Sequence, residues 1–101
     1  MYYLLIYDVV PDYEERRAQY RKLKARYTKA FLERGELLLA GALADPADRA
    51  FVLIQSDSPK TAEDFAKNDP YVTNGLVTNW EVRVWRIVVG AGVEPIQEWK
   101  P

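Results

Sequence analysis

The chain contains no cysteine and no histidine. Without a thiol or an imidazole it cannot form a disulfide, a thiolate nucleophile, a Ser–His or Cys–His pair, or an imidazole-bound zinc or iron site. Any catalysis must therefore use aspartate, glutamate, lysine, tyrosine or arginine side chains. We also expect no metal and no cofactor, because the sequence has neither a metal-ligand cluster nor a glycine-rich phosphate-binding motif.

Three further features of the sequence limit the partners and the location of the protein. No run of about 18 apolar residues is present, so we expect no membrane span. The formal net charge is -1, whereas general nucleic-acid binding depends on a basic surface, so we expect no nucleic-acid partner. Met1 leads directly into an apolar segment without a basic region or a cleavage site, which predicts a cytoplasmic protein.

Apolar stretches separated by proline, glycine and aspartate predict a β-α-β-β-α-β order. At 101 residues the chain is long enough for one domain around one core. We predict an α+β, ferredoxin-like domain over residues 1–89. The remaining residues, 90–101, are expected to pack as a tail on the domain or on a partner subunit, because they include Trp99. The predicted elements are strand 2–9, helix 12–34, strand 37–44, strand 50–55, helix 59–67 and strand 79–88.

One carboxylate stands at a forced break in the backbone. Pro70 disfavours the helical conformation for Asp69 and cannot continue a helix that precedes it. We therefore predict that the second helix ends here and that a short helical turn begins, with Asp69 as its N-cap and Pro70 at its first position. Asp69 has two interpretations, a purely structural cap or a fixed acid, base or ligand acceptor.

The first predicted helix has an apolar stripe and a basic edge. At about 100° per residue, the stripe expected to face the core contains Tyr20, Leu23, Tyr27, Ala30 and Phe31. One edge of the stripe carries Arg17, Arg21, Lys24 and Thr28. This edge is either solvated, with its aliphatic stems covering apolar surface, or it binds an anion.

Both faces of the predicted sheet require cover. Residues 3–7 and 51–54 are apolar at both odd and even positions, but two helices can cover only one face. The last strand places Trp80, Val82 and Val84 on one face, and it gives the other a mixed character with Glu81, Arg83, Trp85 and Ile87. We therefore expect a homodimer that packs sheet face against sheet face, with a single sheet bearing one apolar surface as the alternative.

The segment Gly35-Glu36-Leu37-Leu38-Leu39-Ala40-Gly41-Ala42-Leu43, the Asp-Pro-Tyr triplet at 69–71 and the aromatic strand after it resemble the YCII-related family over residues 2–89. The resemblance implies the dimeric α+β-barrel fold. Family members typically carry an Arg on the first helix and a catalytic His three residues later. Arg21 matches the Arg, but the His position is Lys24 here. Asp69, Tyr71 and Gly41 match the family's Asp-Pro-Tyr motif and the glycine of its second strand.

The resemblance implies an activity that the lysine puts in question. Some family members are dehydrochlorinases or lactone-isomerase-like enzymes, in which the His acts on a cyclic organic acid or phenol. An unperturbed lysine, with a pKa near about 10.4, stays charged where a histidine exchanges protons. Two functions therefore remain open.

The first is a lyase or isomerase for a small anionic, cyclic metabolite. In this hypothesis Asp69 is the acid or base, Arg21 and Lys24 bind the anion, and Tyr7 or Tyr71 donates a hydrogen bond. The second is a non-catalytic ligand-binding or accessory module that kept the cleft and lost the chemistry with the histidine.

Overall fold

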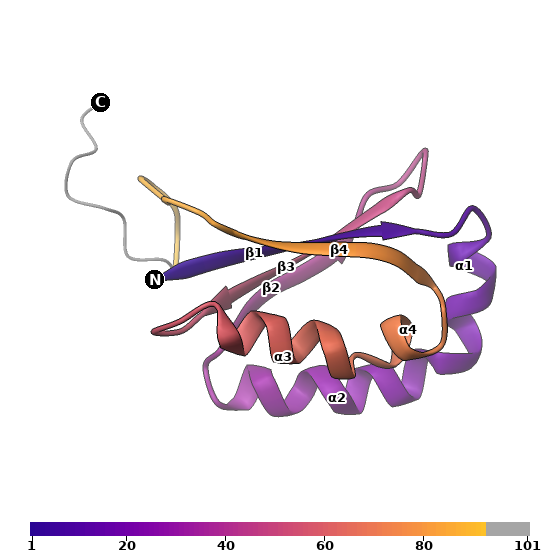
Figure 1. Cartoon of the computed structure of the whole chain (residues 1–101), viewed down its shortest axis with the longest axis horizontal. Helices are drawn as coiled ribbons and strands as arrows, with labels where there is room; N and C mark the ends of the chain where they lie inside the picture. Colours follow the sequence, from indigo (N-terminus) through magenta and orange to yellow (C-terminus); the bar gives the residue numbers. More distant parts are fainter. Residues whose placement is uncertain (93–101) are drawn as a thin grey trace.

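The computed structural model describes residues 1–92, which form a four-stranded antiparallel sheet with helices on one face (Figure 1). The strands are β1 (Tyr2–Val9), β2 (Leu37–Ala42), β3 (Arg49–Gln55) and β4 (Val77–Val84), in the spatial order β2-β3-β1-β4. The helices are α1 (Tyr13–Arg16), the 3₁₀ helix η1 (Arg17–Tyr20), α2 (Arg21–Glu33), α3 (Lys60–Asn68) and α4 (Pro70–Thr73). The predicted α+β, ferredoxin-like fold is confirmed.

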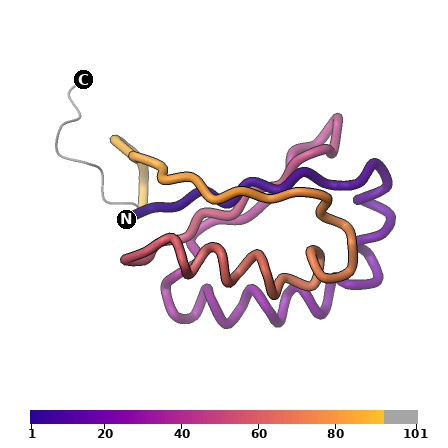
Figure 2. The backbone as a smooth tube through the Cα atoms, viewed as in Figure 1, coloured from indigo at the N-terminus to yellow at the C-terminus, as the bar shows by residue number. Residues whose placement is uncertain are grey.

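β1 is a central strand because it pairs with β3 on one side and with β4 on the other. Its side chains alternate between the two faces, and Tyr3, Leu5 and Tyr7 point toward the helices and are buried. The chain path in Figure 2 brings the start of β1 and the segment after β4 to the same end of the sheet. The opposite end of β1 therefore leads into the first helices.

The core lies between the inner face of the sheet and the helices. Phe65 of α3 is completely buried, and its ring lies 5.0 Å from the ring of Tyr27 and 4.8 Å from that of Phe31, both on α2. This aromatic cluster joins the two long helices to each other. Such ring pairs contribute about 0.5–1.5 kcal/mol each beyond the apolar area that they bury.

The first helix differs from its prediction. A single helix over 12–34 was expected, but the chain forms α1, η1 and α2 in succession. Of the predicted core stripe, Leu23 is 49% exposed and Ala30 is also exposed, so their placement in the core was wrong. Lys24 is instead turned inward beside Tyr27, because its ammonium group pairs with a buried carboxylate. Periodicity alone does not detect such a pair.

The other boundaries shift by a few residues. β4 ends at Val84 rather than at residue 88, and Ile87 packs with Tyr2 and Leu53 in a small second cluster. α3 begins at Lys60, whose N–H donates to Ser58 Oγ at 3.3 Å. Most of the predicted tail, from residue 93 onward, lies outside the described residues. Within residues 1–92 no helix has both the length and the hydropathy needed to cross a membrane.

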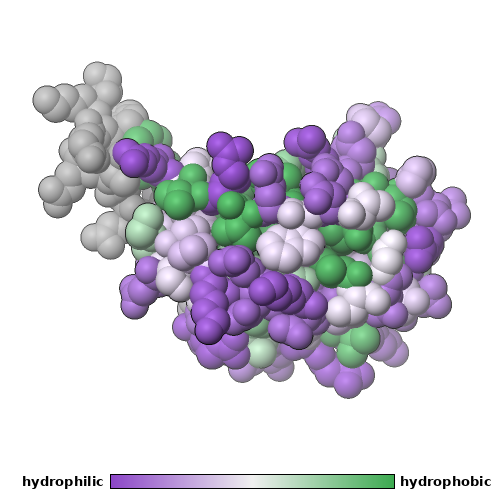
Figure 3. All heavy atoms as spheres, viewed as in Figure 1, coloured by the Kyte–Doolittle hydropathy of each residue, from purple (hydrophilic) through white to green (hydrophobic). Residues whose placement is uncertain are grey.

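The outer face of the sheet, which no described helix covers, is apolar on β2 and in the middle of β1 and β3, but on β4 it carries Glu81 and Arg83, which pair with Ile6 and Leu4. It contains a hollow of about 230 Å³ lined by Leu4, Leu39, Phe51, Leu53 and Trp85, among others. Leu39 is 67% exposed and Trp85 is 46% exposed. Figure 3 views the sheet along its edge and shows hydrophobic and hydrophilic residues side by side at the level of the sheet.

Candidate functional site

Asp69 lies at the junction of α3 and α4, and it is completely buried. Its backbone is extended, with φ -63° and ψ 126°, as the following proline requires. Its Oδ1 accepts a hydrogen bond of 2.9 Å from the backbone N–H of Tyr71. The prediction that Asp69 caps the short helix with Pro70 at the first position is therefore confirmed.

The second carboxylate oxygen of Asp69 binds two side chains from distant parts of the sequence. Oδ2 accepts a hydrogen bond of 2.7 Å from the hydroxyl of Tyr7, which lies on β1. The same oxygen forms a salt bridge with Lys24 Nζ, which lies on α2. Three segments thus meet at one buried carboxylate, and both of its oxygens are bound by the protein itself.

Lys24 has an unusual environment for a lysine. Its side chain is only 16% exposed, and its Nζ lies 4.9 Å from the ring centre of Phe65 and 5.0 Å from that of Tyr71. Burial lowers the pKa of Lys24, and the carboxylate of Asp69 opposes that shift. The amine is therefore easier to deprotonate than a surface lysine, while the carboxylate and the rings favour the ammonium form.

The tyrosines around this pair remain hydrogen-bond donors. Burial raises the pKa of Tyr7 far above its ordinary value, and the Asp69 carboxylate raises it further. Burial also raises the pKa of Tyr13 and of Tyr71. Their hydroxyl groups consequently keep their protons at neutral pH.

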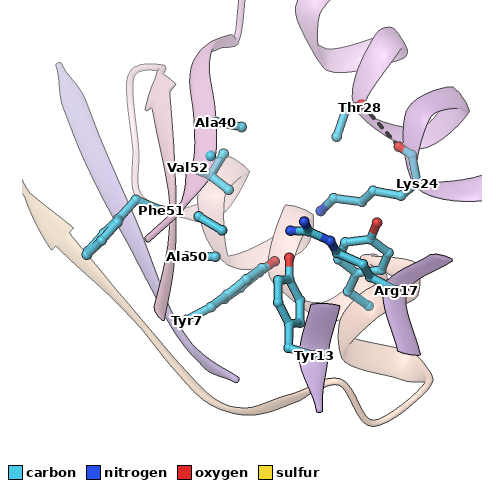
Figure 4. Close-up of a pocket in the computed structure, with 12 residues that line it drawn as sticks. Tyr7, Tyr13, Arg17, Lys24, Thr28, Ala40, Ala50, Phe51 and Val52 are labelled. Carbon is cyan, nitrogen blue, oxygen red and sulfur yellow. Dashed lines mark hydrogen bonds between the residues drawn. The ribbon is translucent and has the colours of Figure 1, made fainter. Parts of the chain in front are cut away.

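A cavity of about 260 Å³ opens next to the pair. Its polar end is formed by Tyr7, Tyr13, Arg17 and Lys24, whose side-chain ends converge in Figure 4. Small and apolar residues of β2 and β3 form the opposite wall and leave room for a ring. The complete lining consists of Tyr7, Tyr13, Arg17, Lys24, Thr28, Ala40, Gly41, Ala42, Ala50, Phe51, Val52 and Tyr71.

The structure brings most of the predicted site residues to this cavity. Tyr7, Lys24, Tyr71 and Gly41 line it. Asp69 does not, because it lies behind Lys24 and Tyr7 and is sealed from solvent. A Cβ atom built on Gly41 would meet no atom within 4 Å, so nothing in the described chain requires a glycine there.

Arg21 is placed differently from its prediction. It is exposed and does not line the cavity, although its charge still opposes the rise that burial causes in the pKa of Tyr71. Arg17 occupies the cavity instead. Because η1 has about three residues per turn, positions four apart across it lie about 120° from each other rather than on one face.

Two residues of the cavity's polar end, Arg17 and Tyr13, were not predicted as site residues. Arg17 was placed on the same helix edge as Lys24, and that spacing was the available signal for it. Tyr13 gave no such signal, because its role depends on packing against Tyr71 at a ring distance of 5.8 Å and an angle of 87°. Only the folded chain brings these two rings together.

This arrangement offers two cations, several phenol donors and an apolar wall. It is suited to an organic anion with a flat ring, and its lysine can transfer a proton when it is neutral. Within residues 1–92 the structure contains no group of three or more Asp or Glu side chains placed to hold a metal ion.

Comparisons with known proteins identify the family. The model of the YCII-related domain matches residues 1–86. A search of curated protein sequences gives no match. Among solved structures, the chain is similar to the 5-chloro-2-hydroxyhydroquinone dehydrochlorinase TftG from Burkholderia phenoliruptrix AC1100, in complex with 2,5-dihydroxybenzoquinone, with a TM-score of 0.72 and 17% sequence identity. That match covers 86% of this chain and 95% of the other.

At this identity the structural match supports the fold alone. The family model, in contrast, spans nearly the whole described chain, including the helix that carries Lys24 and the Asp-Pro-Tyr triplet at 69–71. On that match, the chain belongs to the YCII-related domain family.

Proposed function

We propose that this protein is a cofactor-independent lyase or isomerase that binds a small cyclic organic anion in the cavity beside Lys24. The observation that carries the proposal is the pairing of a completely buried carboxylate with a lysine whose amine reaches that cavity. A buried ion pair is often no more stabilising than apolar side chains of similar volume. A lysine whose pKa is lowered by burial, paired with a buried carboxylate at the wall of a cavity, is therefore better explained by chemistry than by stability.

In this proposal Lys24 contacts the substrate and Asp69 acts through it. The sequence-based hypothesis made Asp69 itself the acid or base, but its burial and its three hydrogen-bonding partners leave it no path to a ligand. Asp69 instead orients Lys24 and Tyr7. Lys24 in its neutral form removes a proton from the ring substrate, and a leaving group such as chloride departs with its electron pair, or the proton returns elsewhere on the ring.

The tyrosines and the apolar wall supply binding. The hydroxyl of Tyr71 is available at the cavity to donate a hydrogen bond to a ring oxygen, and Tyr7 is held in place by Asp69. The dehydrochlorinase of similar fold is described with a dihydroxybenzoquinone, which is a flat ring with acidic hydroxyl groups. We take that compound class as the first set of test ligands.

A second function is favoured by a specific observation. Three aromatic rings and one carboxylate surround Lys24 Nζ, and all of them stabilise its ammonium form. A permanently charged lysine binds anions but does not accept protons. If the ammonium form dominates, the protein is a ligand-binding or accessory module.

The decisive experiment combines binding and turnover. We would titrate the protein with 2,5-dihydroxybenzoquinone by calorimetry and measure chloride release from 5-chloro-2-hydroxyhydroquinone. Lys24→Gln is expected to weaken binding at least about tenfold, because it removes the charge that contacts the anion. The exposed Lys29→Gln on the same helix is the control and should bind like the native protein. Equal binding by both variants would refute the site.

Turnover then separates the two functions. Chloride release by the native protein that disappears in Lys24→Gln supports the lyase. Binding without turnover supports the module, and there the substitution Lys24→His gives the converse test, because imidazole exchanges protons at neutral pH. If that variant gains activity, the lysine at this position is the reason why the native protein has no turnover.

We also propose that the protein acts as a homodimer joined through the outer faces of the two sheets. This proposal is supported by the apolar hollow around Leu39 and Trp85, which no helix of the described chain covers. Exposed apolar surfaces of this kind usually mark an interface. In such a dimer both helical layers face outward, and each cavity stays on its own subunit's inner face.

A further inference from the structure

Arg17 is the charged residue of the cavity lining that the proposed chemistry does not use. Its Nε is buried and has no hydrogen-bond partner among the described residues. Its guanidinium group lies 5.2 Å from the ring centre of Tyr13. In the described part of the chain, no ion pair involves Arg17.

The charges around the cavity are therefore unbalanced. Arg17 and Lys24 both line it, but the neighbouring carboxylate of Asp69 is already bound to Lys24 and to Tyr7. The buried Nε is closed off from the cavity, so a ligand contacts the terminal nitrogens of Arg17, which Figure 4 shows directed into the cavity. An anionic ligand group at these nitrogens would neutralise the remaining charge.

The geometry also indicates the kind of acceptor. A guanidinium group presents a rigid planar fork that matches a carboxylate with two parallel hydrogen bonds. The contact with Tyr13 restricts the orientation of that fork, and Tyr13 is in turn held edge-on by Tyr71. Figure 4 shows Arg17 of η1 and Lys24 of α2 reaching toward the same space, so both can contact one small molecule.

We propose that Arg17 binds a carboxylate of the ligand, so that the natural ligands are ring-bearing carboxylic acids. The ring oxygen then lies at Lys24, the carboxylate lies at Arg17, and the ring packs on the small residues of β2 and β3. This inference rests on the proposed function, because it assigns the second anchor of the same cavity. It makes Arg17 a specificity residue rather than a catalytic one.

The test uses two ligands that differ only by the carboxylate. We would compare the dissociation constants of 2,5-dihydroxybenzoate and hydroquinone for the native protein and for Arg17→Gln, Arg17→Lys and Arg26→Gln. The native protein should bind the acid at least about tenfold more tightly than hydroquinone. Arg17→Gln should reduce that preference to about twofold or less, with little change for hydroquinone. The exposed Arg26 is the control, and its variant should keep the full preference.

Arg17→Lys is a second variant of the same position, and it keeps the experiment informative if Arg17→Gln does not fold. It keeps the charge but loses the fork, so it should retain only part of the preference. Arg21→Gln tests the competing assignment from the sequence. An unchanged preference in Arg17→Gln, an equal loss in Arg21→Gln, or no preference in the native protein would each overturn the inference.

The outcome also separates this inference from the proposed function. If hydroquinone or 2,5-dihydroxybenzoquinone binds in a manner that depends on Lys24, but the carboxylate adds nothing, the assignment of Arg17 fails and the proposed function stands. If no ring compound binds, both fail together.

Discussion

Replacing Lys24 by methionine should destabilise this protein far more than removing an ordinary helix lysine. The substitution keeps the length of the side chain but leaves the completely buried carboxylate of Asp69 without its cation. Breaking a buried ion pair in this way costs about 3–5 kcal/mol. We expect about 3 kcal/mol, the lower end of that range, because Tyr7 and the Tyr71 N–H still donate to Asp69.

The assay is urea unfolding followed by tryptophan fluorescence, for native protein, Lys24→Met, Asp69→Asn and the double variant. In a domain of this size a loss of about 3 kcal/mol also lowers the melting temperature by about 12–24 °C. Lys29→Met is the matched control, since Lys29 forms an exposed pair with Glu33, and it should cost less than about 0.5 kcal/mol.

The double variant measures the pair itself. Asp69→Asn keeps an acceptor for the helix cap but removes the charge, so the doubly substituted protein has no unpaired buried ion. We expect it to be at least about 2 kcal/mol more stable than the sum of the two single losses predicts. If the losses add within about 0.5 kcal/mol, Lys24 and Asp69 are not coupled and the reasoning about the site is wrong.

Two further predictions concern the dimer and the tyrosines. Sedimentation equilibrium at micromolar concentration should return twice the chain mass of 11.7 kDa, and Leu39→Glu should return the chain mass because a carboxylate buried at the interface has no partner. Leu32→Glu, at an exposed leucine of α2, should remain dimeric, and a monomeric native protein would contradict the proposal. Stability should fall as the pH rises above about 10, because unfolded tyrosine ionises there whereas Tyr7, with its raised pKa, stays protonated in the folded state. Tyr7→Phe should flatten this decline by up to about 1.4 kcal/mol per pH unit, and identical alkaline profiles would refute the assignment.

Much of the fold follows from local chemistry. The apolar character of β1 predicted a buried strand, and most of its side chains are buried. The break at Asp69 and Pro70 was predictable because a proline constrains its own backbone and that of the residue before it. The absence of histidine and cysteine likewise restricts the available acid–base groups to carboxylates, amines, phenols and guanidinium groups, whatever fold the chain adopts.

The inward face of the first helix was not predictable in the same way. A periodicity argument assumes about 100° per residue throughout, and η1 breaks that phase ahead of α2. This change of phase places Arg17 in the cavity position that was expected for Arg21, and a short 3₁₀ segment has no sequence signal strong enough to reveal it. Leu23 lies within α2 itself and turns toward solvent because the salt bridge of Lys24 with Asp69 rotates the inward face of that helix toward Lys24.

The sequence by itself thus determined the order of the strands and helices, the cap at Asp69 and the kinds of side chain available for catalysis, because each depends on residues close together in the chain. Only the tertiary structure decided what those side chains do. Lys24 and Asp69 are 45 residues apart, and Tyr7 is 62 residues from Asp69. These residues come into contact only because α2 and α3 pack on the sheet. That packing buries the carboxylate of Asp69 completely and lowers the pKa of Lys24.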